Sequence, residues 1–288
     1  CAEQFLDKND DRPFFLYLPH TLVHTAMGPG TTPLEPKPEL LAKYESKAGT
    51  ELHRNPAYAA MVEALDQAVG RTVEALRNRG ILANTFVIFA SDNGAALGSR
   101  RVTKSGVAVG QNTSNFPLRE GKLQLYEGGI RIPTSISYGN IIRKDAVSDA
   151  VISQLDLLPT ILELAEHPQA SEIMESLDGE SLVPLLSDAH SNWPLRDLFW
   201  HFPGYRIRDF RTMAGQRPES AMRRGNWKLI ESLETGDVQL YDLATDIGES
   251  NDVSAAHPEV VANLRKRLQS WRDETDAPMP ERKRTDQR

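Results

Sequence analysis

"TFVIFASDNG", residues 85–94, joins a run of large apolar residues directly to an acid, an amide and a glycine. A short apolar run bounded by turn-forming residues is typical of a buried β-strand. Residues 56–79, which precede it, repeat apolar side chains every three or four positions, and this spacing predicts an amphipathic helix that ends before Gly80. A helix, a strand and a polar loop in this order predict the α/β class, with a mostly parallel sheet flanked by helices.

Other segments extend this pattern in both directions. Residues 14–18, FFLYL, predict a second buried strand, and residues 151–164 predict another helix. Residues 221–230 and 238–243 predict short strands, and Pro258 begins a last amphipathic helix. The polar stretch over residues 94–115, which follows the strand that ends before Asp92, predicts a loop.

The composition becomes more polar near residues 166–176, which predicts a domain boundary there. We therefore expect a larger α/β part over residues 1–168. Residues 169–288 are expected to form a smaller C-terminal α+β subdomain with short antiparallel strands and a terminal helix.

The bulk composition excludes several classes of protein. The 288 residues are 40% hydrophobic and 25% charged, and they contain no apolar run long enough to predict a membrane span. The formal net charge of −7 argues against a protein whose main partner is a nucleic acid. The single cysteine, Cys1, cannot form a disulfide within the chain.

Asp92-Asn93-Gly94 has two interpretations. Ligands of open α/β sheets gather at the carboxyl ends of the strands, and carboxylate and amide oxygens suit a hard cation such as Ca²⁺ or Mg²⁺. The alternative is a plain turn, because these residues are common turn formers. Two oxygens are fewer than the six to eight that Ca²⁺ takes, so a metal would need further ligands from elsewhere.

Three other side chains are candidates for chemistry. His20 and His24 follow the first predicted strand, and either imidazole could protonate a leaving group. Lys122, with Gly121 before it and Gly128-Gly129 after it, could neutralise charge that develops on a leaving oxygen. The alternatives are loop histidines without a role and a solvated surface lysine. The sequence contains no P-loop, serine-hydrolase or common zinc motif.

Taken together and in order, several segments resemble the sulfatase family of the alkaline phosphatase-like superfamily. They are "RPFFLYLPHTLVHTAM" (12–27), "YAAMVEALDQAVGRTVEALRNRGILANTFVIFASDNG" (58–94), "NFPLREGKLQLYEGGIRIP" (115–133) and a tail that includes "LDLLPTILELA", "LDGESLVPLL" and "MRRGNWKLI". The resemblance implies an alkaline phosphatase-like fold that is incomplete at the N-terminus. Residues 1–168 would then be the C-terminal portion of the catalytic α/β domain.

The resemblance also implies roles for individual residues. Asp92 and Asn93 match calcium ligands, with Mg²⁺ as a possible substitute, and Lys122 matches the lysine that contacts the sulfate and the bridging oxygen. The family histidine usually lies six positions after the last apolar residue of its strand. Counted from Leu18, that position is His24 rather than His20.

The sequence departs from the family pattern at several points. It has no Cys-x-Pro-x-Arg or Ser-x-Pro-x-Arg motif, so the formylglycine nucleophile is expected only in a segment N-terminal to this chain. The two adjacent aspartates that complete the family's metal site have no counterpart before residue 24. Glu120 and Leu123 occupy positions where glycine is more usual.

The sequence thus predicts a sulfuric ester hydrolase fragment, arylsulfatase-like, that supplies the metal, lysine and histidine parts of the site and is inactive by itself. The expected substrate is a sulfated small molecule or glycan, and family habit favours a periplasmic or secreted location. One alternative is a non-catalytic sulfatase-like remnant or binding module. Another is a phosphodiesterase or phosphonate hydrolase of the same superfamily.

Overall fold

The computed structural model describes residues 2–8, 12–25, 34–98, 100–102, 108–139, 142, 145–209 and 214–281. The chain divides into two compact units: the first comprises Cys1–Phe116 and Pro133–Asn140, and the second comprises Pro117–Ile132 and Ile141–Arg288. The boundary expected between residues 168 and 169 stays a prediction. Cys1 lies outside the described residues.

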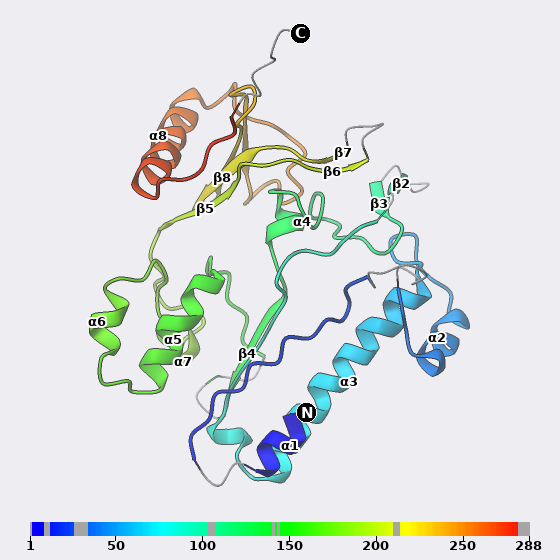
Figure 1. Cartoon of the computed structure of the whole chain (residues 1–288). Coiled ribbons are helices and arrows are strands. Elements are labelled where there is room, and N and C mark those ends of the chain that lie inside the picture. Colours follow the sequence, from blue (N-terminus) through cyan, green and yellow to red (C-terminus); the bar gives the residue numbers. More distant parts are fainter. Residues whose placement is uncertain are drawn as a thin grey trace, which may run out of the picture. The chain divides into compact units, whose positions relative to one another are not determined.

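The first unit is built from short helices, one long helix and two pairs of strands (Figure 1). Its elements are α1 (Ala2–Asp7), α2 (Pro38–Glu45), α3 (Pro56–Asn78), the 3₁₀ turn η1 (Leu82–Asn84), β1 (Phe86–Ala90), β2 (Arg100–Val102), β3 (Ala108–Gly110) and β4 (Thr134–Tyr138).

Helix α3 begins and ends at local signals that its sequence carries. The Asn55 side chain accepts hydrogen bonds from the backbone N–H groups of Ala57 (3.0 Å) and Tyr58 (3.2 Å), which otherwise have no partner in the first turn. Pro56 occupies the first helical turn, and Gly80 follows the last turn with a φ of 71°. The helix predicted over residues 56–79 is therefore confirmed.

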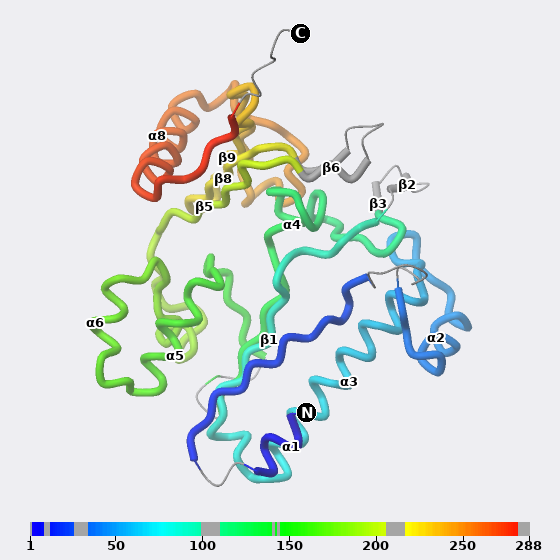
Figure 2. Tube along the Cα trace, viewed as in Figure 1, coloured from blue at the N-terminus to red at the C-terminus, as the bar shows by residue number. Residues whose placement is uncertain are grey.

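The two ends of α3 bury different residues. One end packs Ala60 and Ala64 against Leu40 of α2. The other end packs Ala75 and Leu76 against Leu6 of α1. Val87 of β1 packs against this second cluster, so the strand that leads to Asp92 rests on the end of α3, a path that can be followed in Figure 2.

The strand predicted before Asp92 is confirmed as β1, but its environment differs from the prediction. It pairs antiparallel with β4, with Ile88 opposite Ile136. Its side chains are half-buried or exposed rather than buried, and Phe89 is 36% exposed. Every strand pair formed by the described residues is antiparallel, so the mostly parallel sheet is not confirmed.

The strand predicted over residues 14–18 is wrong. This segment has no strand assignment and appears in Figure 1 as an irregular trace without an arrow. Its side chains alternate as in an extended chain: Phe14 packs against the cluster at the end of α3, whereas Phe15 and Tyr17 are 72% and 75% exposed. Apolar alternation fixes which side chains face inward, but a strand also requires a neighbour that pairs with its backbone groups.

Residues 94–115 also differ from the predicted continuous loop. They include the antiparallel pair β2–β3, in which Arg101 lies opposite Val109. Strands of three residues carry too short a pattern to be read from sequence, which explains why the prediction missed them.

The second unit contains a four-stranded antiparallel sheet in the order β10-β9-β8-β5, with helices packed against it or preceding it. Its elements are α4 (Glu127–Ile130), η2 (Gln154–Asp156), α5 (Leu157–Leu164), α6 (Ala170–Met174), α7 (Val183–Ser187), β5 (Asp197–Phe202), β6 (Arg206–Asp209), β7 (Ala214–Gln216), β8 (Glu219–Arg224), β9 (Trp227–Ser232), β10 (Val238–Asp242) and α8 (Pro258–Glu274). The helix expected within residues 151–164 is confirmed as α5, and the helix from Pro258 is confirmed as α8.

Residues 221–230, predicted as one strand, form parts of the two strands β8 and β9 instead. The chain reverses at Gly225, whose φ of 58° suits glycine, and Arg224 pairs with Trp227 across the turn. The sequence carries a local signal for this turn, because Gly225-Asn226 after Arg223-Arg224 is a typical two-residue hairpin connection, and the prediction overlooked it.

The four-stranded sheet buries both of its faces, because successive residues of a strand point to opposite sides. One face packs against α8 in a cluster of Met222, Leu229, Leu240, Leu264 and Leu268. The other face packs against the segment before α4 in a cluster of Leu125, Ala221, Ile230, Tyr241 and Leu243. No helix within the described parts of the chain is long and apolar enough to cross a membrane.

Candidate active site

Asp92 and Asn93 lie in a tight bend directly after β1. The Ser91 hydroxyl donates to the carbonyl of Asn93 (2.8 Å), and the Asn93 side-chain amide donates to the carbonyl of Gly94 (3.0 Å). Asp92 is exposed, whereas Gly94 is buried. The side-chain NH₂ of Asn93 is thus used within the bend. The side-chain oxygen of Asn93 and the carboxylate of Asp92 remain available to bind a metal ion.

The chain that follows this bend is held by a second loop. The side chains of Asn112 and Asn115 donate to the carbonyls of Ala96 and Ala95, both at 3.3 Å. A Cβ atom on Gly110 would lie only 2.1 Å from the carbonyl oxygen of Leu97, so only glycine allows this approach. The bend therefore rests on a fixed backbone rather than on a free loop.

The chemistry of this bend fits part of a hard-cation site. A carboxylate and an amide oxygen are typical Ca²⁺ ligands, but Ca²⁺ takes about six to eight oxygens. Within the described ranges, no cluster of three or more His, Cys, Asp or Glu side chains could hold a metal ion. Asp92 and Asn93 can thus contribute two ligands to a cation that needs others from elsewhere.

His24 lies next to the C-terminal end of the described segment 12–25. It is exposed, its backbone N–H donates to Thr21 (2.7 Å), and its Nδ1 lies 2.8 Å from the carbonyl oxygen of Thr25. A carbonyl can only accept, so this contact requires a proton on Nδ1, and the neutral ring then presents Nε2 as its acceptor. His20 is exposed as well.

Lys122 lies in a tight loop of the second unit. The loop closes through the backbone N–H of Gln124, which donates to the carbonyl of Gly121 (3.0 Å). Glu120 and Leu123, on either side, have φ angles of 63° and 81°. These angles lie in the left-handed region that favours glycine, which gives a physical reason for the usual glycine at both positions.

Gly128 and Gly129 allow this loop to fold directly onto the start of α4. A Cβ atom on Gly128 would lie 2.3 Å from the carbonyl oxygens of Arg119 and Glu120. A Cβ atom on Gly129 would lie 2.0 Å from the carbonyl oxygen of Gln124. Only glycine at both positions allows the main chain to approach this closely.

Arg119 fixes the N-terminal side of the Lys122 loop to the sheet. Its guanidinium donates to the carbonyl of Glu249 (2.7 Å) and to the Tyr241 hydroxyl (3.1 Å), and it lies 4.1 Å from the ring centroid of Tyr126. The Tyr126 hydroxyl in turn donates to Gln239 on β10 (2.7 Å).

Glu127 fixes the C-terminal side of the same loop through a buried ion cluster. Lys228 Nζ lies 3.0 Å from Glu127 Oε1 and 2.8 Å from Glu249 Oε1, and all three side chains are at most 2% exposed. The backbone N–H of Glu127 donates to Glu249 Oε2 (2.6 Å), and Arg223 lies 3.5 Å from Glu127 Oε2. Burial raises the pKa of Glu249, and Lys228 opposes that shift.

Sequence reasoning missed the anchors Glu249, Lys228 and Arg119. One signal was present: Lys228 and the apolar Ile230 point to the same face of a strand, so a charge shares a face with a residue of the core. Such a charge is buried only with partners, and its partners are distant in the sequence.

The predicted site residues fall in both compact units. Asp92, Asn93 and His24 belong to the first unit, and Lys122 belongs to the second. Asp92 and Asn93 lie together in one bend. The convergence of His24 and Lys122 on them stays a prediction.

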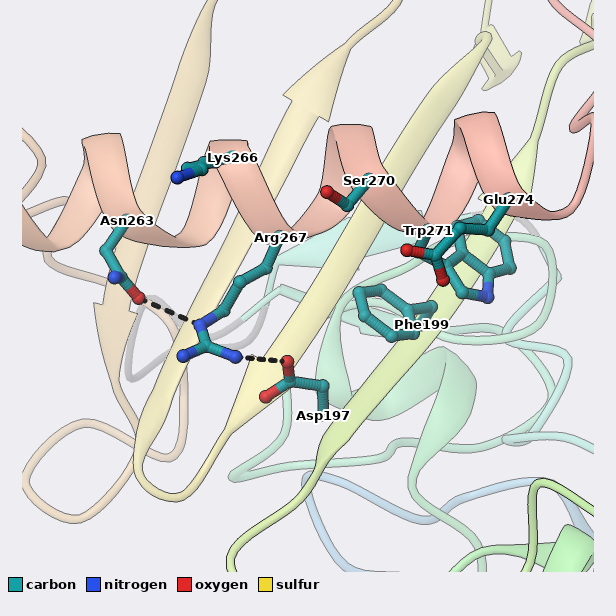
Figure 3. A pocket seen from close by; sticks show the side chains of 8 residues that line it. All are labelled: Asp197, Phe199, Asn263, Lys266, Arg267, Ser270, Trp271 and Glu274. Atoms are coloured by element: carbon teal, nitrogen blue, oxygen red, sulfur yellow. Dashed lines mark hydrogen bonds and ion pairs between the residues drawn. The ribbon is translucent and has the colours of Figure 1, made fainter.

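A separate pocket of about 450 Å³ lies between α8 and β5, and it contains none of the predicted site residues (Figure 3). Its charged groups are partly neutralised within the pocket wall, since Arg267 donates to Asp197 (3.0 Å) and to Asn263 (3.0 Å). Phe199 and Trp271 stack beside them with ring centroids 4.9 Å apart. We assign this pocket no role in the candidate site.

The fold is alkaline phosphatase-like: the structures that share it include Ps i-CgsB, 28% identical to this chain, and phosphonate monoester hydrolases. Residues 2–167 match the family model described as Sulfatase. Residues 121–274 match one described as N-sulphoglucosamine sulphohydrolase, C-terminal. The chain belongs to the sulfatase family.

Its relatives include a sulfatase of Formosa agariphila, 32% identical over 93% of this chain and 48% of that protein. An N-acetylgalactosamine-6-O-sulfatase of Bacteroides thetaiotaomicron is 26% identical over 93% of this chain and 49% of that protein. The structure of Ps i-CgsB in complex with k-i-k-neocarrahexaose has a TM-score of 0.70 and 28% identity, and it covers 94% of this chain and 52% of that one. The chain spans about half the length of these relatives.

Proposed function

We propose that the protein that contains this chain hydrolyses sulfate esters, and that this chain supplies the lysine, the histidine and two metal ligands of the active site. The observation that supports the proposal most directly is the family match over residues 2–167, which includes all four residues. The structure adds a fixed bend for Asp92 and Asn93 and an anchored loop for Lys122.

The physical task is to let a nucleophile approach a sulfur atom surrounded by negative oxygens. Lys122 would place an ammonium group against the sulfate and the bridging oxygen, where negative charge grows as the ester bond breaks. His24, when it carries a proton on both ring nitrogens, would donate a proton or hydrogen bond from Nε2 to the leaving oxygen. Since His24 is exposed and its Nδ1 contacts a carbonyl, Nε2 is the ring atom that would face the substrate.

Asp92 and Asn93 would hold a Ca²⁺ ion, or Mg²⁺ in its place, through the carboxylate and the side-chain amide oxygen. Such a cation supplies positive charge next to the sulfate oxygens. The nucleophile would be a formylglycine from outside these 288 residues, since the sequence lacks the motif in which it forms.

The proposed substrate class is a sulfated glycan, with an aryl sulfate as a practical probe. The name of the Bacteroides relative, an N-acetylgalactosamine-6-O-sulfatase, supports a sulfated sugar. We also propose a periplasmic or secreted location, where such polymers are accessible.

The test of the substrate class compares matched aryl esters. The intact protein is assayed on an aryl sulfate and on the corresponding aryl phosphate diester, and we expect the higher kcat/KM on the sulfate. A higher kcat/KM on the phosphate diester would replace the proposal with the phosphodiesterase alternative. No turnover of either ester, or of a sulfated sugar, would favour the non-catalytic alternative.

The metal assignment has its own test. We expect Asp92→Ala in the intact protein to abolish the calcium-dependent part of the activity and to weaken Ca²⁺ binding measured by calorimetry, because one of the anionic ligands is lost. Asp149→Ala, at another exposed aspartate, is the control. Unchanged Ca²⁺ affinity in Asp92→Ala would remove Asp92 from the metal site.

A further inference from the structure

The Lys122 loop is attached to the C-terminal sheet on both sides of the lysine. On one side Arg119 donates to the Glu249 carbonyl, and on the other side the backbone N–H of Glu127 donates to the Glu249 carboxylate. One residue, Glu249, thus receives a hydrogen bond from each end of the loop. The distances are 2.7 and 2.6 Å.

The loop between these attachments is strained. Glu120 and Leu123 hold positive φ angles, a conformation that costs a non-glycine residue about 1–2 kcal/mol. Such backbone strain persists only where the surrounding structure holds the chain in place. The contacts of Arg119 and Glu127 with Glu249 are placed to do this.

The buried charges explain why these contacts are rigid. Lys228 lies between Glu127 and Glu249, and Arg223 lies 3.5 Å from Glu127. Two cations thus face two carboxylates, and removing any one of these four groups leaves an uncompensated charge. Arg223, 16% exposed, brings the cluster a second positive charge. Tyr241 adds a buried hydroxyl that accepts from Arg119.

We propose that Glu249, together with Lys228, is a positioning residue for Lys122: it holds the strained loop so that the ammonium group meets the substrate in the geometry that the reaction needs. This inference rests on the proposed function only for its catalytic consequence. The attachment of the loop is a property of the second unit and is testable without substrate.

The sheet supplies a matched control on its opposite face. Glu231 of β9 is also a buried, ion-paired glutamate, with Arg272 at 2.8 Å and Arg265 at 2.7 Å. It contacts residues of α8 and not the Lys122 loop. Glu231→Gln therefore removes a buried charge of the same kind without touching the proposed attachment.

The first readout is backbone hydrogen exchange in the intact protein, at a temperature well below unfolding. In Glu249→Gln we expect faster exchange over residues 119–130, because the amide cannot both accept from Glu127 N–H and pair with the Lys228 ammonium. In Glu231→Gln we expect exchange in this segment to match that of the wild type. Equal exchange in Glu249→Gln and wild type would overturn the proposal, whether or not the protein hydrolyses sulfate esters.

The second readout is a kinetic cycle on an aryl sulfate. We expect Glu249→Gln to lower kcat by about tenfold or more while KM changes little, since small displacements of a catalytic group have effects of this size. The double variant Lys122→Ala/Glu249→Gln should be no slower than Lys122→Ala, because Glu249 acts through the lysine. If the reduction of kcat in the double variant is the product of the reductions in the two single variants, Glu249 acts separately from Lys122, and the proposal is overturned.

If Glu249→Gln fails to fold, Glu249→Asp serves the same purpose, because it keeps the buried negative charge but shortens the side chain that reaches the Glu127 N–H and Lys228. We expect a smaller change of the same kind in both readouts, and no change in either would contradict the proposal. Wild-type protein without activity on any sulfate ester would refute the proposed function, and hydrogen exchange would then decide the positioning role alone.

Discussion

At the scale of single residues, the surroundings of Lys122 are the most unusual feature of the chain. The residues on both sides of the Gly121-Lys122 pair adopt left-handed backbone conformations although neither is a glycine. Glu120 also places a carboxylate close to the lysine in sequence. Conformational strain and a neighbouring negative charge are costs that a purely structural surface loop would not need to retain.

Lys122→Ala in the intact protein is the direct test of the lysine. We expect kcat on an aryl sulfate to fall by about 10²–10³-fold, the range found when a donor that stabilises transition-state charge is removed, and KM to change less. Lys266→Ala, an exposed lysine on α8, is the control and should leave both parameters unchanged. A Lys122→Ala enzyme with unchanged kcat would remove this lysine from the mechanism.

At the scale of elements, signals within a few residues could be read from the sequence, whereas pairing partners could not. Helix α3 was predicted correctly because Pro56, its apolar spacing and Gly80 are all local. The segment that contains Phe15 was assigned wrongly because its apolar alternation says nothing about whether a neighbouring strand exists. The β8–β9 turn was missed although Gly225-Asn226, directly after Arg223-Arg224, is a local hairpin signal.

The candidate site shows the same division. Asp92, Asn93 and Lys122 could be proposed from short motifs and family resemblance. Glu249 could not, because its two contacts join it to residues more than 100 positions away. A buried ion cluster is a product of tertiary packing, and no local pattern specifies it.

The N-cap of α3 gives a prediction at this scale. We expect Asn55→Ala to lower the free energy of unfolding by about 1 kcal/mol, because the N–H groups of Ala57 and Tyr58 lose their acceptor. Lys37→Ala is the matched control, since Lys37 occupies the same position of α2 and makes no side-chain capping bond. Thermal unfolding followed by circular dichroism measures both, and equal midpoints for the two variants would contradict the assignment.

At the scale of the whole molecule, the chain passes between its two compact units more than once. Residues Pro117–Ile132 belong to the second unit, and the residues immediately before and after them belong to the first. Lys122, proposed as catalytic, and the proposed metal ligands Asp92 and Asn93 are therefore carried by different units.

A prediction about the chain as a whole concerns its activity in isolation. We expect the purified 288-residue chain to show no calcium-dependent hydrolysis of aryl sulfates, because its sequence contains no residue in a formylglycine motif to attack sulfur. The intact protein, assayed in parallel, is the positive control. Calcium-dependent turnover by the purified chain that Lys122→Ala abolishes would show that another nucleophile operates.

The glycine pair at positions 128 and 129 has a consequence for how this protein can vary. Every single-nucleotide missense change of a glycine codon introduces a residue with at least a methyl group, and at both positions that group would collide with main-chain carbonyl oxygens. A single-nucleotide missense substitution at Gly128 or Gly129 is therefore expected to disrupt this loop. A saturation library selected for sulfate-ester cleavage should retain both glycines, while Glu120 and Leu123 should accept glycine because their φ angles are positive.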